Sequence, residues 1–405
     1  MKTRAKSEYK KCFPYLLHLL SCAINGKTPS NPSADSEWTD KDWEVLLRLS
    51  EFHSVANTVA FAVSALSDVV NIPQHVVAAF SRHKAMSVVA DTNISVETET
   101  LLQLLGDAGV DVLPVKGYVL RQDYPLSAMR SMTDVDIIYN SKKKKKVRDI
   151  FLARGYELTE SGYELDFKKD GINHYELHGA SDKSPATSHT FLPDILSRAV
   201  YDNKSHIGRL TIEDSYLYIL SHLAKHILGG GAGIRMVMDV YVFYNAHGKS
   251  MNRAYLAEQL RTLRLAEFEK KIRFLAYSWF QTSTPDTNSV LADFILCACT
   301  FGITRDAFLE SALKKEKETG KKQTSSKTIF SKIFPSFKFI SEVYPVVAKC
   351  RILYPFCIPV YWFTRIFKKR NINTENFRHY FIDTDSEDAE RLRAAINQAG
   401  LSNFL

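Results

Sequence analysis

Apolar residues recur at helical spacing along the first hundred positions of the chain. Residues 1–25 and 38–108 carry apolar side chains three or four positions apart, which is typical of amphipathic helices. A stretch rich in Ser, Pro and Asn, residues 28–36, separates the first two helices. Asp40 is the predicted N-cap of the second helix. The pattern therefore predicts an N-terminal helical region over residues 1–108.

The hydrophobic period changes to two in the next part of the chain. Residues 112–115 and 134–139 form short apolar runs with the composition of strands. Residues 163–167 and 172–178 alternate around Asp170-Gly171, and Asp-Gly is a favoured tight-turn dipeptide, so they predict a hairpin. Helical segments lie between the strands. This alternation predicts a mixed α/β core over residues 109–205.

Helical spacing returns after residue 206. The pattern predicts helices from Ile212 to the glycine-rich run 229–233, and again from Ile234 onward. The charged, polar stretch 314–327 has the composition of a linker. We therefore predict an α+β protein in which a small mixed-sheet core is flanked by N- and C-terminal helical regions. Its later parts are a helical domain, residues 206–312, a linker, residues 313–328, and a C-terminal helical segment, residues 329–405.

The composition is that of an ordinary globular protein with a basic net charge. The 405 residues are 45% hydrophobic and 24% charged, with a net charge of +8. This charge suits a nucleotide but is too diffuse to require nucleic acid. Five consecutive lysines, Lys142–Lys146, spread around more than one helical turn and have no interleaved aromatic residues, so we interpret them as solvated. We expect no nucleic-acid partner.

The cysteines and the apolar segments predict where in the cell the protein is located. None of the six cysteines forms a Cys-x-x-Cys pair and no secretory signal precedes them, which predicts reduced thiols in the cytoplasm. Residues 352–367 are the most apolar segment. They contain two prolines and Arg365, so we expect no membrane-spanning helix. A helix packed on the body is the favoured interpretation, and peripheral membrane contact through residues 352–370 remains an alternative.

Two acidic residues one position apart are the main chemical signal. Side chains alternate faces along a strand, so Asp134 and Asp136 point the same way, with Val135 and Ile137 behind them. Two adjacent carboxylates repel each other unless a cation lies between them. Mg²⁺ prefers such oxygen ligands and is usually bound by one or two carboxylates together with substrate phosphates. This pattern indicates phosphoryl or nucleotidyl transfer.

The predicted hairpin supplies a third acid. Glu176 shares a face with His174 and His178, and it faces the same site if its strand lies beside the strand of Asp136. Glu164 and Asp166 on the partner strand are rivals. A solvated polar strand face explains the pattern equally well from the residues alone.

Basic residues lie close to these acids in sequence. Lys116-Gly117 joins a predicted strand to a short helix, where backbone N–H groups and a lysine can bind phosphate. Arg130 is placed to reach a triphosphate, with a role at the edge of the core as the alternative. His222 and His226 are spaced i, i+4 without the glutamate of a zinc protease, so we assign them a supporting role together with Lys225. Arg235 and Asp239 have the same spacing and can pair along one helix.

These motifs resemble the uncharacterised bacterial nucleotidyltransferase family of the polymerase-beta superfamily. The resemblance extends over roughly residues 40–370. It rests on Lys116-Gly117, Tyr124-Pro125, Arg130, Asp134-x-Asp136, Glu176-Leu177-His178, Glu213-Asp214, His222-Leu223-Ala224-Lys225-His226, Arg235-x-x-x-Asp239, Tyr344-Pro345 and Pro359-x-x-Trp362-x-x-Arg365.

The resemblance implies an Mg²⁺-dependent enzyme that moves an NMP from an NTP to a hydroxyl group of an unknown acceptor. Two Mg²⁺ ions would be bound by Asp134, Asp136 and Glu176, and the triphosphate by Lys116, Gly117 and Arg130. The superfamily usually has Gly-Ser or Gly-Gly a short way before the paired acids, whereas Tyr118 follows Gly117 here. A catalytically inactive relative that binds a nucleotide or a partner therefore remains the alternative.

Overall fold

The computed structural model describes most of the chain up to residue 297 and a few segments beyond it. The predicted linker, residues 313–328, and most of residues 329–405 lie outside the described residues. The five predicted regions and their boundaries stay a prediction. Described are residues 3–32, 38–67, 69–161, 164–171, 173–180, 195–201, 205–229, 231–297, 337, 340, 351–355, 357 and 387–404.

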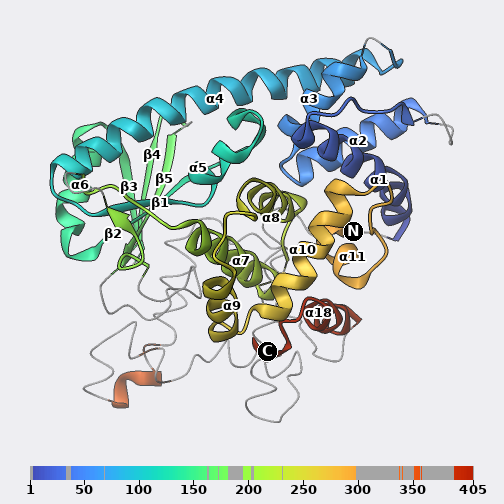
Figure 1. Ribbon diagram of the computed structural model, residues 1–405. Coiled ribbons are helices and arrows are strands. Elements are labelled where there is room, and N and C mark those ends of the chain that lie inside the picture. The colour runs from blue at the N-terminus through green and yellow to red at the C-terminus, as the bar shows by residue number, and fades with distance from the viewer. Residues whose placement is uncertain are drawn as a thin grey trace.

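Four helices precede the sheet, and the last of them spans the molecule. They are α1 (Thr3–Asn25), α2 (Asp40–Phe52), α3 (Ala56–Leu66) and α4 (Gln74–Asp107). Helix α4 has 34 residues and is therefore about 50 Å long. It runs from α3 at one end to the sheet at the other (Figure 1). The N-cap of α2 is Thr39 and not the predicted Asp40, because the Asp42 carboxylate accepts a hydrogen bond from the Thr39 backbone N–H at 2.8 Å.

A five-stranded mixed sheet confirms the predicted α+β class. Its order is β1-β2-β5-β4-β3, with β2 and β5 parallel and the other neighbours antiparallel. The predicted hairpin forms between β4 and β5, and Asp170 (φ 55°) and Gly171 (φ 66°) in its loop both have positive φ. The elements are β1 (Val112–Val115), α5 (Gly117–Leu120), β2 (Val135–Asn140), α6 (Lys144–Ala153), β3 (Glu157–Ser161), β4 (Glu164–Lys169) and β5 (Asn173–Ala180).

The two faces of the sheet differ in chemistry. Alternate residues of β2, β4 and β5 form an apolar face that packs in one cluster with residues of α4 and α6. The opposite face of β2 and β5 carries Asp136, Glu176 and His178. Because one face is covered by apolar contacts, the register of the strands is fixed, and the polar side chains cannot exchange faces with the apolar ones. The polar face lies towards the later helices.

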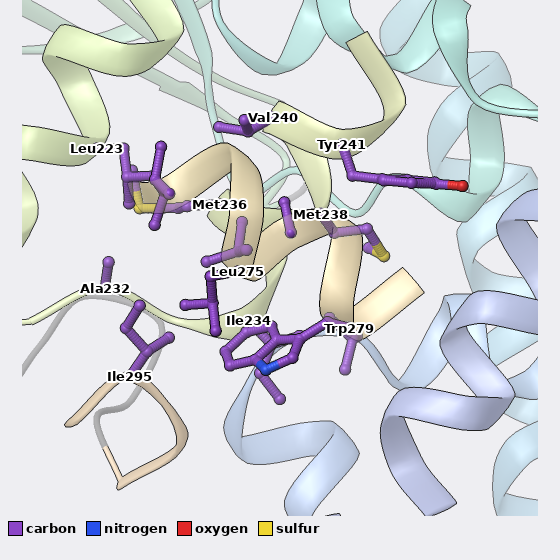
Figure 2. Packing of buried hydrophobic residues seen from close by; sticks show 14 of the residues in the cluster. Leu223, Ala232, Ile234, Met236, Met238, Val240, Tyr241, Leu275, Trp279 and Ile295 are labelled. Atoms are coloured by element: carbon purple, nitrogen blue, oxygen red, sulfur yellow. The ribbon is translucent and has the colours of Figure 1, made fainter. Parts of the chain in front are cut away.

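The later helices share one hydrophobic core with α1, α2 and α3. Figure 2 shows part of this core, where Met238 of α8, Leu275 and Trp279 of α10 and Ile295 of α11 pack together. Regions predicted as separate along the sequence are therefore joined by apolar contacts in space. The later elements are β6 (Val200–Tyr201), β7 (Gly208–Arg209), α7 (Ile212–Leu228), α8 (Ile234–His247), α9 (Arg253–Thr262), α10 (Ala266–Gln281), α11 (Val290–Cys297) and α18 (Glu387–Gln398).

Within the described ranges, no helix is both long and apolar enough to span a bilayer. Of the segment considered for peripheral membrane contact, only residues 352–355 and 357 are described. Of the described cysteines, Cys12, Cys22 and Cys357 are free thiols.

The buried imidazole of His53 predicts a pH-dependent stability. Its side chain is fully buried, its Nε2 lies 3.2 Å from the Leu296 carbonyl oxygen, and burial lowers its pKa to about 4. Folding therefore favours the neutral ring, so its contribution is complete above about pH 6.5 and is lost as the pH falls towards 4, an effect of about 3 kcal/mol. In denaturant titrations at several pH values, His53→Gln should flatten this slope. An unchanged slope would contradict the prediction.

Candidate metal and nucleotide site

Three acids predicted from the sequence come together on the polar face of the sheet. The parallel register of β2 and β5 pairs Asp136 directly with Glu176, and Asp134 lies one residue before β2. Two groups of possible ligand atoms, each within 4.8 Å, share Glu176: one contains Asp134 and His174, the other Asp136 and His178. The strand pairing that the sequence left open thus places Glu176 beside both aspartates. These two groups have the composition of divalent-cation sites.

Asp136 is the best-buried of these acids and has two basic neighbours. Its Oδ1 lies 2.6 Å from the Lys116 ammonium and 2.9 Å from His178 Nε2. Burial favours the protonated carboxyl, but the Lys116 charge and the His178 hydrogen bond outweigh it and hold the pKa of Asp136 far below its usual range. Asp136 is therefore ionised at neutral pH.

Glu176 experiences the opposite effect. Burial and then the charges of Asp134 and Asp136 raise the pKa of Glu176. Carboxylates that raise one another's pKa are stabilised when a cation lies among them. The donor set therefore fits a divalent metal ion, on the evidence of its own electrostatics.

Lys116 stands at a sharp bend between β1 and α5. Its backbone has φ 54° and ψ −128°, a left-handed conformation that a non-glycine residue rarely adopts and that costs about 1–3 kcal/mol. The bend turns its ammonium towards Asp136. Helix α5 has only four residues, so a helix dipole adds little to phosphate binding here. The lysine side chain itself is the main cation at this end of the site.

Gly117 makes room for Arg130. A Cβ built on Gly117 would collide with the Arg130 guanidinium and lie 3.0 Å from the Met132 side chain. Close packing of the arginine therefore explains why position 117 carries no side chain, and the predicted role of Gly117 in phosphate binding stays a prediction.

This close approach predicts the effect of a single methyl group. Gly117→Ala should displace Arg130 and lower the free energy of unfolding by about 1–3 kcal/mol, the usual cost of overpacking. The matched control is Gly106→Ala, in helix α4, where the nearest atom to an added Cβ is an Ile207 side-chain carbon at 3.5 Å. It should be neutral or stabilising because alanine favours a helix. Urea titrations measure the free energy of unfolding of both variants. An equal change in the two would contradict the close packing of Arg130 against Gly117.

Arg130 and Asp239 form a nearly buried ion pair. Arg130 Nε and Nη2 donate to the two carboxylate oxygens of Asp239 at 3.1 and 2.8 Å, and the Tyr124 hydroxyl donates to the same carboxylate at 2.7 Å. The i, i+4 spacing had suggested that Asp239 pairs with Arg235 along α8. This expectation is wrong, because Asp239 pairs with Arg130. The role of Arg130 in holding a triphosphate stays a prediction, because its guanidinium is engaged by a carboxylate.

Among the described residues, Arg235 has no carboxylate partner. Its side chain is 8% exposed, Nη1 donates to the Ser131 carbonyl oxygen at 3.0 Å, and Nε has no hydrogen-bond partner. Burial, and then the neighbouring charge of Arg130, lowers its pKa to about 10. The guanidinium thus remains charged at neutral pH. A buried cation without a counter-ion is costly, which is typical of a site that receives an anion.

One cavity of about 330 Å³ collects these side chains between the sheet and helices α7 and α8. Every predicted site residue except His178 lines it, and His178 is hydrogen-bonded to Asp136. Tyr218 was missed by the sequence analysis, although it precedes His222 and His226 at i, i+4 spacing. The lining residues are Lys116, Gly117, Leu120, Arg130, Met132, Asp134, Asp136, Glu176, Tyr218, Ile219, His222, Leu223, Lys225, His226, Arg235, Met236 and Asp239.

The helical wall of the cavity carries unused polar atoms. The Tyr218 hydroxyl and His222 Nδ1, like Arg235 Nε, have no hydrogen-bond partner among the residues that the structure describes. Burial and the Lys116 charge lower the pKa values of both His222 and His226, to about 4 for His226, so both rings are neutral at pH 7. Within the part of the chain that is described, the Lys225 ammonium makes no hydrogen bond or ion pair. Unsatisfied polar atoms around one cavity indicate a polar ligand.

The fold and the site define a nucleotidyltransferase. A family model described as uncharacterised nucleotidyltransferase matches residues 39–281, which is more than half of the chain and includes every residue that lines the cavity. The chain belongs to this family, and it is a transferase whose acceptor is unknown. No curated protein and no solved structure matches it.

Proposed function

We propose that this protein transfers an NMP from an NTP to a hydroxyl group of an acceptor, with Mg²⁺ bound at the carboxylates. The observation that carries the proposal is the convergence of Asp134, Asp136 and Glu176 in one cavity with Lys116 and Lys225. Carboxylates next to lysines match a metal–triphosphate complex in charge and in ligand type. The cytoplasm, where NTPs and Mg²⁺ are abundant, is the proposed location.

The acids are suited to hold the metal. Asp134, Asp136 and Glu176 would be its oxygen ligands, and the two overlapping groups that share Glu176 support two ions. When bound, Mg²⁺ supplies charge stabilisation to the phosphate oxygens. The side chain of His178 would orient Asp136, since its Nε2 lies 2.9 Å from that carboxylate. His174 Nε2 lies 2.7 Å from Asp166, which is not one of the proposed ligands.

The lysines are suited to the phosphates. Lys116 lies 2.6 Å from Asp136, so its ammonium stands next to any phosphate oxygen held at that carboxylate. Burial, and then the charge of Lys116, lowers the pKa of Lys225, as expected for a second cation in the same cavity. An anionic triphosphate would relieve the repulsion between these two lysines.

The proposed reaction forms one bond to phosphorus, breaks one, and moves one proton. The acceptor oxygen forms a bond to the α-phosphorus, the bond from that phosphorus to the β-phosphate bridging oxygen breaks, and pyrophosphate leaves. The acceptor proton moves to a carboxylate oxygen of Glu176. Because burial and the charges of Asp134 and Asp136 raise the pKa of Glu176, it is a stronger base than an exposed carboxylate.

A transfer assay tests the proposal. The protein is incubated with each NTP labelled at the α-phosphate, with Mg²⁺ and a cell lysate, and parallel samples contain EDTA. Labelling of a lysate component that requires both protein and Mg²⁺ is the expected result. A protein that neither binds Mg-NTP in calorimetry nor transfers label would be a non-catalytic relative, and the proposal would be wrong.

A further inference from the structure

A second cavity adjoins the nucleotide site on the side of the N-terminal helices. It has about 420 Å³, and residues of α3, α4 and the segment before β2 line it. Three residues line both cavities: Arg130, Met132 and Arg235. A molecule in the second cavity would therefore be a direct neighbour of a nucleotide in the first. Its size is that of a small-molecule site.

The charge at the junction comes from Arg235. Arg130 has both of its carboxylate contacts to Asp239, so its charge is neutralised within the protein. Within the described ranges, Arg235 donates to Ser131 alone, through Nη1, and its buried Nε has no partner. A planar guanidinium with unused donors is suited to bind phosphate or carboxylate through two parallel hydrogen bonds.

The acids of the second cavity do not compensate Arg235. Glu51 lies 2.9 Å from His83, and Asp91 accepts from Arg121 at 2.6 Å. Each carboxylate thus has its own basic partner. Asp239 and Asp134 attract Arg235 only from a distance, and neither they nor any other described residue forms an ion pair with it. A bound anion would therefore supply the direct counter-ion that Arg235 lacks among the described residues.

The division of cations between the cavities indicates which molecule this is. Lys116 and Lys225 line the first cavity alone, where the metal ligands are, whereas Arg235 lines both. The wall of the second cavity is otherwise largely apolar, with Met86, Ala90 and Ile94 of α4 along it. An occupant would place its carbon skeleton against these side chains and its anionic group at Arg235.

We propose that the second cavity binds the acceptor, and that the acceptor is a small hydroxyl compound bearing a phosphate or carboxylate that Arg235 recognises. This inference rests on the proposed function, because it assigns the acceptor side of the same reaction. Arg235 binds the anion and thereby directs the hydroxyl group of the acceptor towards Glu176 and the α-phosphate.

Calorimetry with a simple anion tests the site. The full-length protein is first saturated with Mg²⁺ and an α,β-methylene NTP analogue, which cannot be transferred. Inorganic phosphate, and in a second arm acetate, is then titrated into this complex. We expect binding of at least one of these anions to the wild type, weakened about 10- to 100-fold in Arg235→Met, as for the loss of a charge-assisted hydrogen bond. The anion that binds more tightly, phosphate or acetate, indicates which anionic group the acceptor carries.

Matched variants keep the result interpretable. Arg235→Met should leave affinity for the NTP analogue within about threefold, since triphosphate binding is assigned to the lysines. Arg253→Met removes one exposed positive charge on α9, which lines neither cavity, and should change neither affinity. Circular dichroism of each variant checks its fold.

The outcomes separate this inference from the proposed function. If Arg235→Met loses the NTP analogue, or if the analogue displaces phosphate from the wild type, then Arg235 binds the triphosphate and the inference is wrong. No anion binding to the wild-type complex also rejects it. If the wild type binds no Mg-NTP, the proposed function fails, whereas anion binding that depends on Arg235 still demonstrates the site.

Discussion

We expect Asp136→Asn to lose nucleotide transfer almost completely. Asparagine keeps the shape of the side chain and an oxygen that can accept from Lys116 and His178, which lie 2.6 and 2.9 Å from it. It removes the negative charge that the metal requires. Since metal-based charge stabilisation supplies several kcal/mol, transfer of labelled nucleotide should fall by about a thousandfold or more. Mg-dependent binding of an NTP, measured by calorimetry, should be lost in parallel.

Two variants separate this effect from a general disturbance of the sheet. Asp166→Asn changes an acid that is paired in register with Glu176 but does not line the cavity, and activity should stay within about tenfold of the wild type. Lys116→Met keeps the carboxylates, so metal binding should persist while affinity for the NTP falls. Transfer that survives in Asp136→Asn, or is lost equally in Asp166→Asn, would reject the assigned metal ligands.

Removal of Arg130 should have the largest effect on stability. Its side chain is 9% exposed, that of Asp239 is 5% exposed, and the Tyr124 hydroxyl donates to the same carboxylate. Arg130→Met leaves Asp239 as a buried charge without its main partner, so the free energy of unfolding should fall by about 3–5 kcal/mol. Urea titration followed by tryptophan fluorescence measures this loss.

The neighbouring arginine provides the contrast. Arg235 forms no ion pair in the described structure, so Arg235→Met removes an uncompensated buried charge and should be neutral or stabilising by about 1 kcal/mol. The double variant Arg130→Met/Asp239→Leu removes both partners and should recover much of the loss seen for Arg130→Met. Equal destabilisation by Arg130→Met and Arg235→Met would contradict the assignment of Asp239 to Arg130.

The sequence predicts the acids of the site well because their placement is local. Strand alternation puts Asp134 and Asp136 on one face, and the Asp170-Gly171 turn starts β5 so that Glu176 points to the same face as His174 and His178. Helical spacing likewise groups His222, Lys225 and His226 on one wall of the cavity. These are properties of backbone geometry over a few residues.

The sequence does not predict the partners of the arginines. Arg235 and Asp239 have a spacing that favours an ion pair, yet Asp239 binds Arg130, which is 109 residues away in the chain. The choice depends on the close approach of Gly117, Arg130 and α8, which only the packed structure brings about. The second cavity has no sequence motif for the same reason, since α3, α4 and the segment before β2 meet only in space.

The sequence alone thus determined the α+β class and the pair Asp134 and Asp136 on one strand face, and it predicted Glu176 and the basic and histidine residues as their neighbours without settling the third acid. The tertiary structure decided that β2 and β5 are parallel neighbours, which joins Glu176 to the aspartates. It also decided that Arg130 is neutralised by Asp239, whereas Arg235 forms no ion pair with the described residues. The physical reason is that periodicity acts within one element, whereas strand pairing and buried charge compensation depend on contacts between distant elements.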